Sequence, residues 1–190
     1  MTRGTPNYLA ILLTLAVAGI VGLWAWYGLK APPVQPAASI VTTPSGWKRF
    51  DAGLFNLYAP KYAVLRKLDE PGHSVGQLIG LGLYVKYELG ARTDTLVSGG
   101  TEFSESTIVI DGRPAVLRKA TLDPAQQEAR FGGYGQPSYI GLYIPEAIRL
   151  RTPDGHEQWI ALQVEGAAVN GDLRDTAEMI LRSIRFARSP

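Results

Sequence analysis

An uncharged run of 22 residues, Tyr8–Leu29, constrains this chain more than any other feature of its sequence. As a helix rising ~1.5 Å per residue it would be ~33 Å long, enough to cross a hydrocarbon core of ~30 Å. Its ends carry residue types that favour the membrane interface, a cation on each side and aromatic rings at the far end. We expect these interface residues to be Arg3, Trp24, Trp26, Tyr27 and Lys30. The run predicts one transmembrane helix in the lipid bilayer.

A cleaved signal peptide is the alternative interpretation, because Ala16–Ala18 matches the A-x-A cleavage pattern. Cleavage there would leave a strongly apolar new N-terminus, and the run exceeds the ~7–15 residues of a signal-peptide core. We therefore expect an uncleaved anchor. Arg3 and the α-amino group, set against Lys30, weakly favour an N-terminus inside the cell. In a bacterium this predicts a single-pass inner-membrane protein with its soluble domain in the periplasm.

The composition argues against several functional classes. Nineteen Lys and Arg oppose 17 Asp and Glu without a basic stripe, so we expect no nucleic-acid partner. Cysteine is absent, which excludes disulfides, thiolate metal sites, a cysteine nucleophile and a lipid-anchoring cysteine. The two histidines lie in turn-like contexts without the spacing of metal ligands, so we expect no metal and no cofactor.

The chain divides into four parts: an N-terminal flank at 1–7, the anchor at 8–29, a linker at 30–46 and a domain at 47–187. The linker contains Pro32, Pro33, Pro36 and Pro44, which favour extended backbone. At ~3.1 Å per residue it reaches at most about 50 Å. It is typical of a tether that holds a domain away from a membrane.

The domain shows the period of two that is typical of strands. We expect two short strands in Trp47–Pro60, joined near Ala52-Gly53, and one long strand at Gln77–Glu88. Gly80 and Gly82 within the long strand indicate a bulge or a close neighbour. Two further pairs of strands are expected, at Ser106–Thr121 around the Asp111-Gly112 turn and at Tyr139–Leu150 with Glu157–Glu165.

A C-terminal helix follows the strands. Asp172 is its expected N-cap, with Asp175 at the third helical position. Arg182 and Arg185 are expected in its last turn, where cations suit the helix dipole. Its apolar stripe at helical spacing consists of Leu173, Ala177, Ile180, Leu181 and Ile184. Because this stripe must be buried on the sheet, the fold class is α+β, a mostly antiparallel sheet with a helix on one face.

Four segments together resemble the PsbP-like superfamily, and specifically its bacterial DcrB-like members. They are FNLYAP (Phe55–Pro60), LGLYVKYELG (Leu81–Gly90), IDGRPA (Ile110–Ala115) and AEMILRSIRF (Ala177–Phe186). The resemblance covers roughly Trp47–Phe186 and implies an antiparallel sheet flanked by helices, an α/β/α sandwich. Members of the family act by binding proteins, as assembly factors, chaperones or envelope components, and share no catalytic residue set.

A G-x-S-x-G motif, Gly72–Gly76, raises the alternative of a small serine hydrolase with Ser74 as nucleophile and His156 as base. The nucleophile elbow needs a strand before the serine and a helix after it. Here a predicted strand follows, and the 42 residues from Ala31 to Gly72 are too few for the required sheet. We interpret the motif as a glycine-rich loop that enters a strand.

A connection of 15 residues, Asp123–Pro137, is the candidate for partner binding, because loops of this length in compact domains are often functional. Arg130, Phe131 and Tyr134 are residue types found at interface hot spots. The alternative is a short helix at Pro124–Arg130 with Phe131 in the core.

The sequence favours a membrane-anchored envelope protein that binds a protein partner non-enzymatically, as an assembly factor, a chaperone or a toxin-neutralising immunity protein. Binding of a lipid or small molecule between sheet and helix stays open beside the hydrolase, because Leu173, Ile180 and Ile184 are suited to lining such a pocket.

Overall fold

The computed structural model describes residues 43–70, 73–91, 94–152 and 154–187. The predicted membrane span at 8–29, its interface residues and most of the linker lie outside these ranges. Within them, no helix is long and apolar enough to cross a bilayer.

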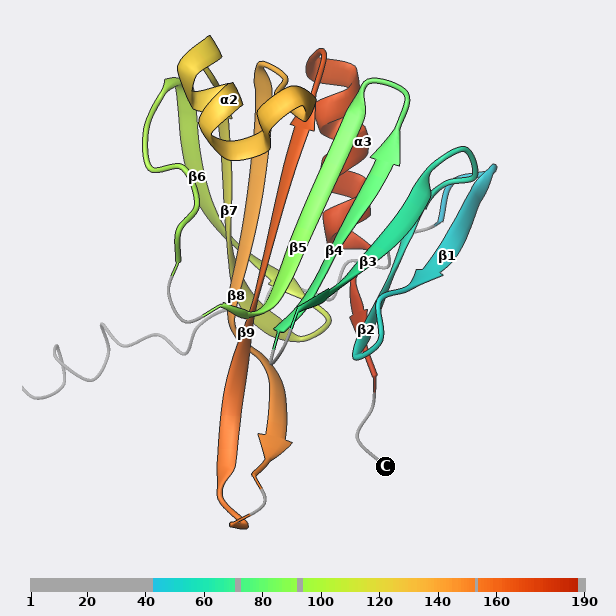
Figure 1. The fold of residues 1–190 in the computed structure, drawn as a ribbon, viewed down its shortest axis with the longest axis vertical. Coiled ribbons are helices and arrows are strands. Elements are labelled where there is room, and N and C mark those ends of the chain that lie inside the picture. The colour runs from blue at the N-terminus through green and yellow to red at the C-terminus, as the bar shows by residue number, and fades with distance from the viewer. Residues whose placement is uncertain (1–42, 71–72, 92–93, 153, 188–190) are drawn as a thin grey trace, which may run out of the picture. The chain divides into compact units, whose positions relative to one another are not determined.

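The described residues form two antiparallel sheets and two short helices, so the α+β class is confirmed (Figure 1). The large sheet has the strand order β3-β4-β5-β9-β8-β7-β6, and the small sheet has the order β1-β2-β10. The strands are β1 (Trp47–Asp51), β2 (Phe55–Pro60), β3 (Val64–Glu70), β4 (His73–Gly80), β5 (Leu83–Ala91), β6 (Thr101–Ile110), β7 (Arg113–Thr121), β8 (Ser138–Arg151), β9 (Glu157–Ala168) and β10 (Arg185–Phe186). The helices are α2 (Pro124–Phe131) and α3 (Gly171–Arg182), and a 3-10 turn, η1 (Gly132–Tyr134), follows α2.

The main core lies between one face of the large sheet, α3 and the small sheet. Helix α3 contacts β9, β8, β5 and β2. Its Ala177, Ile180 and Leu181 are fully buried, and Leu173 packs against the same core. Leu162 and Val164 of β9 meet them from the sheet. The predicted burial of the apolar stripe on the sheet is confirmed, except that the buried Ile184 lies beyond the end of the helix.

Glu178 ties α3 to the sheet. Its carboxylate is paired with Lys119 of β7 and, at 2.7 Å, with Arg182 of the same helix. Burial by itself would raise the pKa of Glu178, but the hydrogen bonds and charges of Lys119 and Arg182 outweigh it and lower the pKa.

Arg182 lies in the last turn of α3 as expected, but the expected N-cap and the expected position of Arg185 were wrong. Asn170, not Asp172, is the N-cap, because its extended backbone lets its side chain accept a hydrogen bond from the Leu173 amide at 3.0 Å. Asp172 lies inside the first turn, and Arg185 belongs to β10, beyond the helix.

The expectation of one long strand at Gln77–Glu88 was also wrong. The segment is a hairpin of β4 and β5 with its turn at Leu81-Gly82. Gly82 has a φ of 66°, a left-handed conformation that glycine adopts without strain. The alternating pattern concealed the turn because it continues on both sides of it. The pattern also missed β3, whose Arg66 and Lys67 are both exposed.

The remaining strand pairs occur where they were expected. The β6–β7 hairpin turns at Asp111-Gly112, both with positive φ. The β8–β9 hairpin is longer than its neighbours, and its tip extends beyond the rest of the sheet (Figure 1).

Candidate binding site on the open face of the sheet

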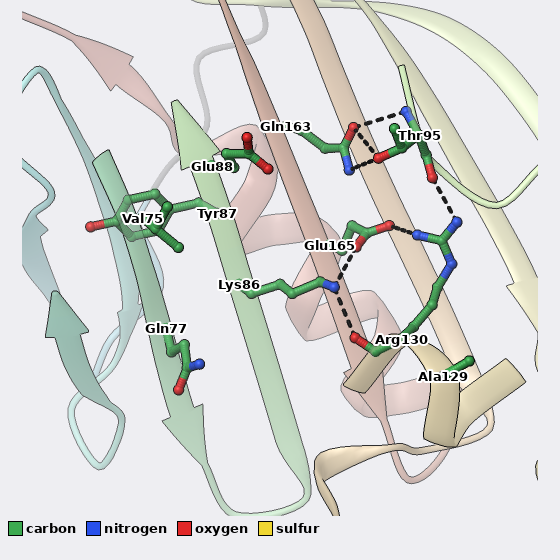
Figure 2. Close-up of a pocket in the computed structure, with 10 residues that line it drawn as sticks. All are labelled: Val75, Gln77, Lys86, Tyr87, Glu88, Thr95, Ala129, Arg130, Gln163 and Glu165. Carbon is green, nitrogen blue, oxygen red and sulfur yellow. Dashed lines mark hydrogen bonds and ion pairs between the residues drawn. The ribbon is translucent and has the colours of Figure 1, made fainter. Parts of the chain in front are cut away.

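The face of the large sheet opposite α3 carries two cross-strand rows of side chains, all of them polar except Val75. Gln77, Lys86 and Glu165 lie opposite one another on β4, β5 and β9. Val75, Glu88 and Gln163 form the next row, two residues along each strand. These rows, with Thr95 and the end of α2, line a cavity of about 520 Å³ (Figure 2).

Glu165 is the centre of this site. Its side chain is only 3% exposed, and a carboxylate buried to that degree is costly unless it is paired and hydrogen-bonded. Lys86 Nζ lies 2.9 Å from Oε2, the Arg130 guanidinium pairs with Oε1, and the Tyr139 hydroxyl donates to Oε1 at 3.1 Å. These three donors satisfy the carboxylate from three different elements.

Arg130 and Lys86 hold the end of α2 against the sheet. The Arg130 guanidinium donates to the Thr95 carbonyl at 2.6 Å, and Lys86 Nζ donates to the Arg130 carbonyl at 2.9 Å. Gln163 joins the same network, since its Nε2 donates to Thr95 Oγ1 at 2.8 Å and its Oε1 accepts from the Thr95 amide at 3.1 Å. The network fixes the walls of the cavity (Figure 2).

Tyr139 is buried beneath this network. Burial, and next the adjacent Glu165 carboxylate, raise its pKa far above the ordinary value. The hydroxyl therefore stays protonated and donates to Glu165, while its oxygen accepts from the Val97 amide at 3.2 Å. Because two cations and the Tyr139 hydroxyl bind its carboxylate, Glu165 is suited to holding the site together.

Local sequence explains the helix that borders the cavity. Asp123 and Gln126 form a capping box, and Pro124 occupies the first turn. Phe131 ends the helix in a small second core with Tyr84 and Tyr139, among others. Of the two alternatives for this connection, the short helix with Phe131 in the core is confirmed.

The three predicted partner-binding residues lie in different settings. Arg130 is bound by Glu165 and Thr95, and Phe131 is buried. Tyr134 is 44% exposed and stacks on Tyr84 with ring centroids 4.8 Å apart. Of the three only Tyr134 is exposed, and a role of any of them in partner binding stays a prediction.

Sequence reasoning missed Glu165 and Lys86. The signal for Glu165 was a single carboxylate within an otherwise buried strand, since residues 161–168 are all buried. Such a charge needs partners from other strands, and the register that brings Lys86 opposite it is visible only in the folded sheet.

Ser74 lies inside β4, which begins at His73, so the expected glycine-rich loop is already strand. The elbow geometry of a strand followed by a helix does not occur there, because β5 follows β4. Gly76 of the motif makes room for the buried Tyr87 ring, which any Cβ at that position would strike. Across the sheet, Ser74 pairs with Leu89 of β5, which in turn pairs with Leu162 of β9. His156 precedes Leu162 by six residues, a distance of about 20 Å along an extended strand, so it lies far from Ser74.

Within the described ranges, no group of three or more His, Asp or Glu residues is arranged to hold a metal ion. Comparison of the chain with protein-family models, curated proteins and solved structures gives no match.

Proposed function

We propose that this protein is a single-pass, membrane-anchored envelope protein whose PsbP/DcrB-like domain binds a protein partner without catalysing a reaction. The observation that carries the proposal is the open polar face of the sheet, where α2 covers one end and leaves a cavity of about 520 Å³. The volume is in the range of binding pockets, about 300–1,000 Å³. A cavity of this volume can hold side chains that a partner inserts.

The contacts of Glu165 and Gln163 in the cavity favour recognition over catalysis. A general base or nucleophile needs a free lone pair within reach of its substrate. Glu165 has its oxygens occupied by Lys86, Arg130 and Tyr139, and Gln163 is bonded to Thr95. Walls held in one geometry lose little entropy when a partner binds, which favours affinity.

The proposed location rests on the sequence. The run at 8–29 anchors the chain in the inner membrane, and the proline-rich linker holds the domain on the periplasmic side. Full-length protein should stay in the membrane pellet after alkaline extraction, whereas residues 31–190 should be soluble and folded. An insoluble or unfolded truncation would count against this organisation.

Photo-cross-linking of the full-length protein in native membranes tests partner binding. A benzoylphenylalanine at Gln77, inside the cavity, or at Tyr134, beside it, should capture one protein in stoichiometric yield. The control position is Leu54, which is 41% exposed in the turn that joins β1 and β2. The same species at all three positions, or none at Gln77 and Tyr134, would contradict the proposal.

The identity of the captured protein distinguishes the versions of this function. A subunit of a membrane complex indicates an assembly factor or chaperone, and a toxin encoded by a neighbouring gene indicates an immunity protein. A fluorophosphonate probe tests the hydrolase alternative. Labelling that is present in the native protein and lost in Ser74→Ala would refute a non-enzymatic role, and we expect no labelling.

A further inference from the structure

Five of the eleven large apolar side chains that are exposed among the described residues lie at one end of the domain. Four segments contribute: the β2–β3 turn, the β4–β5 turn, the connection from β9 to α3, and α3 itself, and the three connections lie toward the upper end of Figure 1. We call this set the apolar end. It consists of Tyr62, Val64, Leu81, Val169 and Met179, which are 50%, 57%, 79%, 43% and 39% exposed.

Contacts link Tyr62 and Val169 to the β4–β5 turn that carries Leu81. Tyr62 lies over Gly80, beside Leu81, so that a Cβ at Gly80 would come within 3.0 Å of the Tyr62 ring. The Val169 amide donates to the Gly82 carbonyl at 3.0 Å, which brings Val169 next to the β4–β5 turn. Exposed apolar residues scattered singly are ordinary, but a contiguous group indicates a binding surface.

The linker enters the domain at this surface. Ser45 and Gly46, the last residues before β1, line an open hollow of about 470 Å³ together with Tyr62 and Met179. The Lys61 amide donates to the Gly46 carbonyl at 3.0 Å. Ser45 and Gly46, at the end of the linker, therefore lie beside the apolar end.

The charges around the apolar end are mixed. Lys48 and Lys61 are exposed and form no ion pair within the described ranges. Asp172 and Asp175 are exposed at the start of α3. With Arg174 between the two aspartates, the charges nearly balance and give no strong long-range attraction, so burial of the apolar side chains must supply most of the affinity. An aromatic ring beside a flanking lysine is typical of membrane interfaces.

We propose that the apolar end lies against the lipid bilayer that holds the anchor, with Leu81 and Tyr62 among the lipid headgroups. This inference rests on the proposed membrane anchor. The 13 residues at 30–42 reach at most about 40 Å at ~3.1 Å per residue, so the tether keeps this end near the bilayer. A tethered contact forms at high effective concentration and needs little affinity of its own.

This contact would orient the whole domain. The strands of the large sheet run away from the apolar end, and the β8–β9 hairpin extends from the opposite end (Figure 1). With the apolar end on the bilayer, the strands stand up from the membrane and the tip of that hairpin points away from it. The open face with its cavity then lies at the side, accessible to a partner in the same membrane.

The absence of cysteine makes a single-cysteine experiment direct. Full-length Leu81→Cys, labelled with the fluorophore NBD, is reconstituted into vesicles of phosphatidylcholine with a minor share of phosphatidylglycerol. The matched control is Leu54→Cys, an exposed leucine in the turn at the other end of β1. We expect blue-shifted emission at Leu81→Cys that a lipid-borne nitroxide quenches. The Leu54→Cys label should keep aqueous emission and be quenched by iodide.

Two outcomes would overturn the proposal. Aqueous emission at Leu81→Cys, equal to that of the control, would mean that the apolar end does not reach the bilayer. A blue shift without nitroxide quenching would mean that protein covers it, either a second copy or the linker. Neither result contradicts the membrane anchor if the chain stays in the membrane pellet after alkaline extraction. Loss of the chain from that pellet would instead contradict the proposed function.

Discussion

Replacing Glu165 with glutamine removes the charge that Lys86 and Arg130 share while keeping the shape of the side chain. Removing one partner of a buried ion pair costs about 3–5 kcal/mol. Lys86 and Arg130 keep 32% and 27% of their side chains exposed, so water can solvate part of the freed charge. The glutamine oxygen also still accepts from Tyr139. We therefore expect a loss of about 2–3 kcal/mol in the free energy of unfolding.

Glu157→Gln is the matched control, because it makes the same substitution on the same strand. Glu157 is 56% exposed and pairs at 3.1 Å with Arg149, itself 54% exposed. Exposed pairs of this kind contribute little, so we expect less than about 0.5 kcal/mol. The two variants differ chiefly in the burial of the carboxylate.

Equilibrium urea unfolding of residues 31–190, followed by circular dichroism, measures both variants. With a slope of about 2 kcal/mol per molar urea, Glu165→Gln should lower the midpoint by about 1–1.5 M and Glu157→Gln by less than about 0.3 M. Equal, small shifts in both variants would refute the reasoning that the buried carboxylate network holds α2 on the sheet.

Three further predictions concern other parts of the domain. Gly76→Ala should lower the free energy of unfolding by about 1–3 kcal/mol, because its Cβ strikes the buried Tyr87 ring; an unchanged urea midpoint would contradict this packing. Asn170→Ala should cost about 1 kcal/mol through loss of the N-cap of α3, and should cost more than Asp172→Ala in the same unfolding assay. The pKa of Glu178 is lower in the folded domain than in the unfolded chain, so the unfolded chain takes up the proton at higher pH. The stability that the ionised Glu178 contributes is therefore present above the unfolded pKa of about 4.5 and is lost as pH falls through the folded pKa. Glu178→Gln should therefore destabilise the domain at pH 7, and the difference from the native domain should vanish in strong acid; a difference independent of pH would contradict the ion pair.

Part of the site followed from the sequence. The capping residues Asp123 and Gln126 define α2, and the short helix with Phe131 in the core was one of the two alternatives that the residues allowed. Glu165 did not follow, because nothing in the spacing along the chain links it to Lys86, 79 positions away. Cross-strand neighbours are set by register, which depends on how whole strands pair.

By itself the sequence determined the α+β class, the hairpin at Asp111-Gly112 and the buried stripe of α3, because these depend on local turn chemistry and on the period of apolar residues. Only the tertiary structure decided that Gln77–Glu88 turns at Gly82, that β3 forms an edge strand, and which polar face stays open. The physical reason is that an alternating pattern fixes which side chains share a face of a strand. It does not fix where that strand reverses, which strand it pairs with, or which charges the pairing buries.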